Sequence, residues 1–233
     1  MIRIQVLASS SRGNCYYVTD GVTPLLLECG ISWKEIQRKL DFKTSEIKGC
    51  LISHEHKDHC KAAEEVAKAS IDCYMSQGTQ EMLNVQGHRI KIVKAKEQFQ
   101  IGTWTIMPFD TQHDAREPLG FLLVNQVRDK LLYLTDTYYC KYTFSGLTHI
   151  MVECNHSYEI LRKNVDSGAV PVEMKKRLIR SHFSLENVIE FLKANDLRKV
   201  QEIHLIHLSD GNSNEELFKI EIQALTGKVV YVA

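Results

Sequence analysis

A chain of 233 residues with 44% hydrophobic and 25% charged residues has the composition of a globular protein that buries a sizeable core. Its 29 basic and 29 acidic residues cancel, which excludes a general electrostatic attraction to nucleic acid or to an anionic membrane. The N-terminal residues are too polar for a secretory signal, and no apolar run is long enough to span a bilayer. We therefore expect a cytoplasmic protein with no membrane contact.

Seven cysteines occur along the chain, and none of them forms a CxxC pair. The odd number and the spacing predict neither a disulfide framework nor a zinc site built from cysteines. We expect buried free thiols in a reducing compartment.

Short runs rich in β-branched and aromatic residues predict strands throughout the chain. In chain order they lie near residues 2–8, 14–20, 24–28, 49–53, 71–75, 103–109, 119–125, 130–135, 148–153, 201–206 and 228–232. Helical patterns begin at Ser32, Lys61 and Ser184, and Ser184 is the predicted cap of its helix. Because strands come first and helices then intervene between pairs of strands, we expect mixed sheets covered by helices. Residues 1–233 contain no repeat and no linker-like segment, so we expect one domain.

The stretch LISHEHKDHC, which follows an apolar strand, places three histidines and an aspartate within six positions. His54 and His56 are two residues apart, so in an extended segment their side chains point the same way. Asp58 and His59 then lie at the entry to the next predicted helix, whose positive end favours a carboxylate. Imidazole and carboxylate ligands together suit zinc, manganese or iron better than magnesium or calcium.

Three further ligand-type side chains, His113, Asp136 and His207, stand where a predicted strand gives way to a loop. Such strand ends are the usual position of site residues in sheet-based folds. A catalytic metal needs three protein ligands and one open position, so these residues can complete two sites that the first cluster begins. Asp136 can bridge two ions because a carboxylate has two oxygens.

These residues resemble the metallo-β-lactamase superfamily. HEHKDH matches the HxHxDH signature of that family, and the three later ligands follow in the order and approximate spacing of its later motifs. The segments LASSSRGNCYYV, ECNHSYEIL, RSHFSLENV and IHLSDGNSNEE look like the YycJ/WalJ-like hydrolases and their short phage-encoded phosphodiesterase relatives.

The resemblance implies an α/β fold, an αβ/βα four-layer sandwich of two mixed β-sheets flanked by helices. It also implies two divalent metal ions, with zinc favoured and manganese or iron as alternatives. By motif, the first metal takes His54, His56 and His113, the second takes Asp58, His59 and His207, and Asp136 lies between them. A hydroxide held by both ions would be the nucleophile, because metal binding lowers the pKa of water from 15.7 to about 7. Compact relatives often dimerise, so a homodimer fits the resemblance.

Two positions depart from the family pattern. Glu28 stands where relatives usually carry the aspartate of a DxG step, and in relatives that residue supports the site from behind the ligands. The longer side chain affects fine positioning more than metal binding. Ser157 stands where relatives often show the aspartate of NHD, and we assign it no role.

His182, in SHFSLENV, resembles the extra histidine of the phosphodiesterase branches. There it contacts the phosphate and acts as general acid toward the leaving oxygen, a role that phosphodiester cleavage needs. Asp58 and His182 are therefore the candidate catalytic residues. Glu153, at a strand end, is expected to orient His182 through a hydrogen bond or else to be a plain strand-end residue.

Three other residues are weighed as substrate or supporting contacts. His156 matches the family pattern and either lines the cleft or is an ordinary core residue. Lys176 and Arg180 lie at i, i+4 on one predicted helix face, which either meets a phosphate or is simply solvated. Cys60 is expected to be a buried thiol and not a ligand.

The favoured hypothesis is a dinuclear metal-dependent phosphodiester hydrolase acting on nucleotides, either a nuclease or a cyclic-nucleotide phosphodiesterase. The zero net charge favours the small substrate, because long nucleic acids reward many Lys and Arg contacts. One alternative is a metallo-hydrolase of another bond, a thioester or a lactam. The other is a non-enzymatic metal or redox protein.

Overall fold

The structure is a computed structural model that describes residues 1–233. It contains two mixed β-sheets flanked by helices, which confirms the predicted fold class. The chain divides into two compact units, one of residues 1–110 and 115–129 and the other of residues 111–114 and 130–233. That residues 1–233 form a single domain stays a prediction. None of the helices has both the length and the apolar character that a membrane crossing requires.

Six strands of the first unit form one sheet in the order β1-β2-β3-β4-β5-β6. Strands β1 to β3 pair antiparallel and β3 to β6 pair parallel. Their bounds are Arg3–Ser10, Gly13–Thr19, Pro24–Leu27, Cys50–Leu51, Cys73–Met75 and Ile90–Ile92. The predicted strand run at the N-terminus is confirmed. Strand β6 was not predicted, because three residues are too few to show a period.

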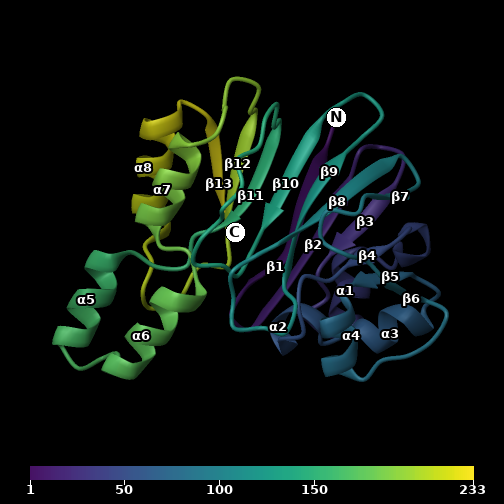
Figure 1. The fold of residues 1–233 in the computed structure, drawn as a ribbon, viewed down its shortest axis with the longest axis horizontal. Coiled ribbons are helices and arrows are strands. Elements are labelled where there is room, and N and C mark those ends of the chain that lie inside the picture. The colour runs from purple at the N-terminus through teal and green to yellow at the C-terminus, as the bar shows by residue number, and fades with distance from the viewer. The chain divides into compact units, whose positions relative to one another are not determined.

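The helices of the first unit are α1 (Trp33–Lys39), α2 (Lys57–Cys60), α3 (Ala63–Lys68) and α4 (Gln77–Leu83), with a 3-10 turn at Thr44–Glu46. Figure 1 shows α1, α3 and α4 gathered beside β3 to β6. Ile36 of α1 and Val66 of α3 are fully buried and pack in one core with Leu26, Cys50 and Ile52 of the sheet side. The apolar faces of these short helices thus cover the parallel strands.

The helix predicted from Lys61 is α3, which begins at Ala63, and a separate short helix, α2, precedes it. The prediction that Asp58 and His59 lie only at the entry to a helix is wrong. The carbonyl of His56 accepts hydrogen bonds from the backbone N–H groups of His59 (2.9 Å) and Cys60 (3.2 Å), which closes the first turn of α2. Asp58 and His59 therefore lie inside a helix and not before it.

Strands β7 (Phe99–Ile101), β8 (Trp104–Asp110) and β9 (Leu119–Val124) complete the first unit as an antiparallel group. Trp104 is fully buried, and its indole N–H donates to the carbonyl oxygen of Thr23 at 2.9 Å. This contact fastens β8 to the turn that precedes β3. Strand β7 was also too short to be predicted.

Four parallel strands organise the second unit: β10 (Lys130–Leu134), β11 (His149–Glu153), β12 (Glu202–Ile206) and β13 (Val229–Val232). The register places Leu134 opposite Val152 and Glu153 opposite Ile206. Nearly all residues of β10 to β12 are buried, as expected for parallel strands.

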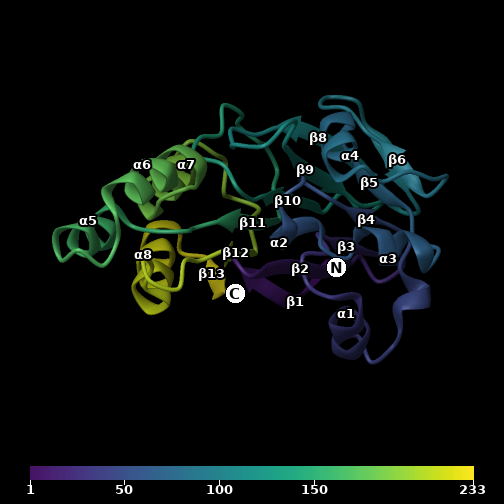
Figure 2. The ribbon, with the colours of Figure 1, turned by 90° about the horizontal axis from the view of Figure 1, so that it is seen from below.

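The helices of the second unit are α5 (Tyr158–Asp166), α6 (Val172–Ser181), α7 (Leu185–Lys193) and α8 (Glu215–Thr226). Ser184 caps α7 as predicted, because its hydroxyl accepts from the backbone N–H of Asn187 at 3.2 Å. Helices α7 and α8 contact each other and lie beside the strands in Figure 1, and α5 and α6 form a second pair at the far end of the unit (Figures 1 and 2). That pair buries only Leu161 and Ser181.

All seven cysteines are free thiols, and six of them are buried. Burial raises the pKa of the Cys60 thiol, whose S–H lies within hydrogen-bond distance of the carbonyl oxygens of Glu55 and His56. The expectation of buried thiols, Cys60 included, is confirmed.

Candidate metal-binding residues

The HEHKDH segment follows β4 and gathers its histidines closely. The hydroxyl of Ser53 lies 2.8 Å from Nδ1 of His54, and Nε2 of His54 lies 3.0 Å from Nδ1 of His56. The rings of His54 and His59 have their centroids 4.2 Å apart. Ser53 therefore contacts one ring nitrogen of His54, and the other faces His56. A metal-binding imidazole usually has such a hydrogen-bond partner on the nitrogen that does not bind the metal.

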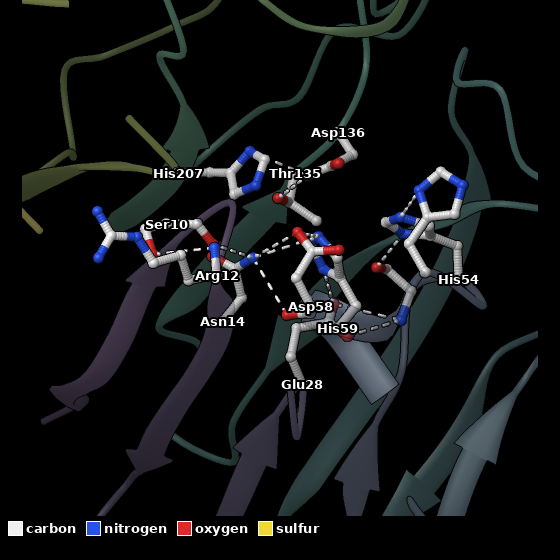
Figure 3. A network of polar contacts seen from close by, with 12 residues as sticks. Ser10, Arg12, Asn14, Glu28, His54, Asp58, His59, Thr135, Asp136 and His207 are labelled. Atoms are coloured by element: carbon white, nitrogen blue, oxygen red, sulfur yellow. Dashed lines mark hydrogen bonds and ion pairs between the residues drawn. The ribbon is translucent and has the colours of Figure 1, made fainter. Parts of the chain in front are cut away.

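Asn14 of β2 binds the second half of this segment. Its side-chain amide donates to the carbonyl oxygen of Asp58 at 3.2 Å and lies 3.4 Å from the Asp58 carboxylate and 3.3 Å from Nε2 of His59 (Figure 3). The hydroxyl of Tyr16 donates to the amide oxygen of Asn14 at 3.1 Å, which fixes the orientation of the amide. The sequence offered Asn14 only as one letter of LASSSRGNCYYV and gave no sign of this contact.

Gly30 allows the Asn14 and Asp58 backbones to approach closely. A Cβ at Gly30 would lie 1.7 Å from the carbonyl oxygen of Asp58 and 2.8 Å from the backbone nitrogen of Asn14. The backbone N–H of Gly30 donates to the Asn14 carbonyl at 2.8 Å, and that of Cys29 donates to the His59 carbonyl at 2.8 Å. The turn after β3 therefore lies directly against the backbone of Asp58 and His59 and holds it in place.

Glu28 is fully buried at the end of β3. Its carboxylate accepts from the backbone N–H of Ser53 at 3.2 and 3.3 Å and lies 3.7 Å from Nδ1 of His59. The longer side chain that departs from the family pattern thus still brings a carboxylate to the ligand segment.

In the second unit, three parallel strands end at ligand-type residues. Asp136 follows β10, Glu153 ends β11 and His207 follows β12, and His182 comes directly after α6. The carboxyl ends of parallel strands meet at one edge of a sheet, which brings these side chains together. The candidate ligand atoms of these four residues all lie within 4.8 Å of one another.

Glu153 holds this group in place and is fully buried. Its Oε1 lies 2.5 Å from Nδ1 of His182 and 2.9 Å from Nδ1 of His207, and its Oε2 accepts from the backbone N–H groups of Thr137 (3.0 Å) and Phe183 (3.1 Å). Of the two alternatives predicted for Glu153, the hydrogen bond that it accepts from His182 is therefore present. One carboxylate satisfies two imidazoles and two backbone donors.

Glu153 and His182 each stabilise the charged form of the other. Burial alone raises the pKa of Glu153, but the positive charge and hydrogen bond of His182 outweigh it, so this pKa lies below its ordinary value. Burial alone lowers the pKa of His182, but Glu153 outweighs it in turn, so that pKa is raised. Since Nδ1 of His182 is hydrogen-bonded to Glu153, Nε2 is the ring nitrogen that can donate a proton to another group.

His113 and Asp136 lie close together in the second unit. Nδ1 of His113 donates to the carbonyl oxygen of Ser181 at 2.8 Å, and its Nε2 lies 3.4 Å from Oδ2 of Asp136. Burial lowers the pKa of His113, which favours the neutral imidazole that binds metals. The hydroxyl of Thr135 donates to Oδ1 of Asp136 at 2.8 Å (Figure 3), and Nδ1 of His207 lies 3.3 Å from the same oxygen.

Three of these residues have a left-handed backbone. The φ angles are 62° for Glu28, 37° for Asp136 and 55° for His207. Non-glycine residues seldom adopt this region, and strained backbone of this kind gathers at functional sites.

The remaining predicted residues have no place in these groups. His156 is fully buried, and neither ring nitrogen has a hydrogen-bond partner; mainly burial lowers its pKa to about 4. Lys176 is exposed on α6 and pairs with Glu173 at 2.9 Å. Arg180 is exposed in the last turn of the same helix. The predicted substrate or supporting contacts of these three residues stay predictions.

The family of the chain follows from its sequence. The model of a β-lactamase superfamily domain matches residues 23–207, from the turn before β3 to the His207 strand end. The chain belongs to this family. The β-lactamase superfamily domain therefore contains every ligand-type residue described above, and the histidine and carboxylate donors fit a divalent metal ion.

Relatives of this β-lactamase superfamily chain cover nearly its whole length. The exodeoxyribonuclease YycJ of Bacillus anthracis is 28% identical, over 95% of this chain and 88% of the relative. The exodeoxyribonuclease WalJ of Streptococcus pneumoniae serotype 2 (strain D39 / NCTC 7466) is 29% identical, over 92% of this chain and 84% of the relative. The crystal structure of the metallo-β-lactamase fold protein YhfI from Bacillus subtilis has a TM-score of 0.73 at 12% identity and covers 100% of this chain and 97% of that one. This last likeness concerns the fold.

Proposed function

We propose that this protein is a metal-dependent phosphodiester hydrolase acting on nucleotide substrates. The observation that carries the proposal is the buried Glu153 carboxylate, which holds His182 beside Asp136 and His207. A histidine held in this way next to metal ligands supplies what phosphodiester cleavage needs, a proton donor at the leaving oxygen. The curated relatives, which carry the name exodeoxyribonuclease, support the same reaction class.

We propose two divalent ions, zinc by preference and manganese or iron as alternatives, held by the seven ligands that the family resemblance assigns. These are His54, His56, Asp58, His59, His113, Asp136 and His207. When bound, such ions lower the pKa of water to about 7 and polarise the phosphoryl oxygens. Support comes from the hydrogen-bond partners of two of these imidazoles. The Ser53 hydroxyl contacts one ring nitrogen of His54, and the Ser181 carbonyl accepts from one ring nitrogen of His113. Metal-binding imidazoles usually have such a partner on the nitrogen that does not bind the metal.

His182 is the proposed general acid of the reaction. Glu153 fixes its Nδ1, so Nε2 would present the proton to the departing oxygen of the substrate. General acid catalysis of this kind contributes about 10²- to 10⁴-fold in rate. It matters most for an alkoxide leaving group, which binds protons strongly, and least for a nitrophenolate.

The substrate is nucleic acid or a small nucleotide, and the names of the relatives favour DNA. The zero net charge favours the alternative version, a cyclic nucleotide, because few phosphates need to be neutralised. Cytoplasmic location and a homodimer remain predictions.

The test is hydrolysis of bis(p-nitrophenyl) phosphate, single-stranded and duplex DNA and a panel of cyclic nucleotides by metal-analysed protein. His182→Ala and Asp136→Ala run beside the wild type. Asp136→Ala should reduce the cleavage of every diester, whereas His182→Ala should reduce mainly the cleavage of DNA and cyclic nucleotides, whose leaving groups are alkoxides. These losses support the proposal, and the preferred substrate chooses between its two versions. No diester cleavage by protein loaded with zinc or manganese overturns it and favours the thioester or lactam alternative.

A further inference from the structure

A pocket of about 280 Å³ lies in the second unit between the segment that follows Asp136 and the helix α7. Four aromatic side chains line it, those of Tyr139, Tyr142, Phe183 and Phe191. No step of the proposed reaction uses this pocket. Its size is just below the ~300–1,000 Å³ of pockets for drug-sized ligands, so it fits one ring system and no larger body.

The pocket is built on the same carboxylate as the candidate site. Phe183 comes directly after His182, and its backbone N–H donates to Oε2 of Glu153 at 3.1 Å. The backbone N–H of Thr137, two residues before Tyr139, donates to the same oxygen at 3.0 Å. The two segments that line the pocket are therefore both hydrogen-bonded to Oε2 of Glu153, and Oε1 of the same carboxylate contacts His182.

A series of ring contacts runs through the pocket wall. Tyr142 lies 6.5 Å from Phe144, Phe144 lies 6.4 Å from Phe191, and Phe191 lies 6.1 Å from Phe183, measured between ring centroids. Phe183 and Phe191 are buried, whereas Tyr139 is 58% exposed. The ring contacts thus run from Phe183, the neighbour of His182, to Tyr142, and the exposed ring of Tyr139 also lines the pocket, where a flat ligand can stack on it.

Polar side chains also line the pocket. The side-chain amide of Asn187 donates one N–H to the carbonyl of Tyr138 at 3.1 Å and accepts from the hydroxyl of Tyr158 at 3.4 Å, which leaves one N–H and one lone pair unused. Nζ of Lys141, another lining residue, lies 5.3 Å from the centroid of the Tyr142 ring, so a cation stands over this ring. Aromatic faces, an amide and a cation are the groups with which proteins bind nucleobases and their phosphates.

We propose that this pocket binds a nucleobase of the substrate and thereby positions the adjoining phosphodiester at the edge formed by Asp136, His182 and His207. The inference rests on the proposed phosphodiester hydrolysis and adds the part of the substrate that the enzyme recognises. Stacking on Tyr142 and Tyr139 accepts any base, because every base has a π face.

The test compares diesters that differ only in the base and share one leaving group. Substrates are the p-nitrophenyl esters of thymidine 5′-phosphate and deoxyadenosine 5′-phosphate, and methyl p-nitrophenyl phosphate, which has no base. All three release p-nitrophenolate, so the same absorbance reports each reaction. Tyr142→Ala is expected to lower the ratio of kcat/KM for the nucleoside esters to kcat/KM for the methyl ester by about tenfold to hundredfold, the range of one lost stacking contact. Asn187→Ala tests the amide in the same way.

Tyr231→Ala is the matched control, since Tyr231 is an exposed tyrosine of the second unit that lies outside the pocket, on β13. Its ratio should equal that of the wild type. A ratio that stays unchanged in both Tyr142→Ala and Asn187→Ala overturns the pocket proposal, even where all three esters are cleaved. Wild-type protein that is loaded with metal and cleaves none of the three esters overturns the proposed function instead.

Discussion

Oε1 of Glu153 lies 2.5 Å from Nδ1 of His182, and both groups stand at the carboxyl edge of the parallel strands β10 to β12. The same oxygen also holds His207 at 2.9 Å. The position of both imidazoles, and the raised pKa of His182, therefore depend on one fully buried side chain.

Glu153→Gln should lower diesterase activity by about 10- to 100-fold, the usual effect of removing a partner that orients a site histidine. The amide keeps the size of the side chain but removes the charge that stabilises protonated His182. The loss should be larger for a diester with an alkoxide leaving group than for a nitrophenyl ester. Glu202→Gln, which alters the Glu202–His204 contact of 3.1 Å on β12, is the control and should leave both rates near those of the wild type. Equal losses on the two esters would point to general damage.

Removal of metal should destabilise the protein as well as inactivate it. A ligand present at 100 times its Kd stabilises the folded state by about 2.7 kcal/mol, so chelation with EDTA should lower the melting temperature and zinc or manganese should restore it. Asp136→Asn should show a much smaller shift, because the amide is a weak ligand. Metal analysis of the restored protein should give two ions per chain. An identical shift in the wild type and the variant would contradict the assignment of Asp136.

Gly30→Ala should lower the free energy of unfolding by about 3 kcal/mol or more, since the new methyl group would lie 1.7 Å from the Asp58 carbonyl and the backbone would have to move. Urea unfolding of the two proteins measures the difference. Gly211→Ala is the matched control: no atom lies within 4 Å of the added Cβ, and the change should stay within about 0.5 kcal/mol. Equal urea midpoints for the two variants would contradict this prediction and show that the turn after β3 accommodates the added methyl group at little cost.

His156 should make the folded protein sensitive to acid. Its pKa is lowered to about 4 in the folded state, so between about pH 6.5 and pH 4 the unfolded chain binds more protons at this position than the folded one. Stability is then lost as the pH falls through this window, by up to about 3 kcal/mol. His156→Leu removes no hydrogen bond, because both ring nitrogens lack partners, and should show a smaller decrease. Urea unfolding at pH 7 and pH 4.5 compares the two; parallel decreases would exclude His156 as the cause.

Much of the fold could be predicted because the strands are long enough to show a pattern. The strand ends at Leu134, Glu153 and Ile206 were predicted to within one residue, and with them the positions of Asp136 and His207. Strands β6 and β7 and the short helix α2 were not predicted. Each depends on only three or four residues, whose conformation is decided by neighbours far away in sequence and not by local periodicity.

The candidate ligands could be predicted, while much of what holds them could not. Histidines and aspartates at strand ends can be recognised by residue type, and the contact of Glu153 with His182 was one of two alternatives that the strand-end position of Glu153 suggested. Asn14 lies 44 residues from Asp58 in the chain, and nothing in the spacing of these two residues indicates a hydrogen bond. The aromatic pocket likewise depends on α7 meeting the segment after Asp136, which only the folded chain shows.

The left-handed backbone at Glu28, Asp136 and His207 bears on any attempt to make this protein more robust. Each such conformation costs about 1–3 kcal/mol in a residue with a side chain, and glycine would remove most of that cost. A screen that rewards heat resistance alone would therefore tend to collect glycine or asparagine at these three positions. The most heat-stable variants from such a screen would have lost their activity, so selection for stability needs a parallel selection for turnover.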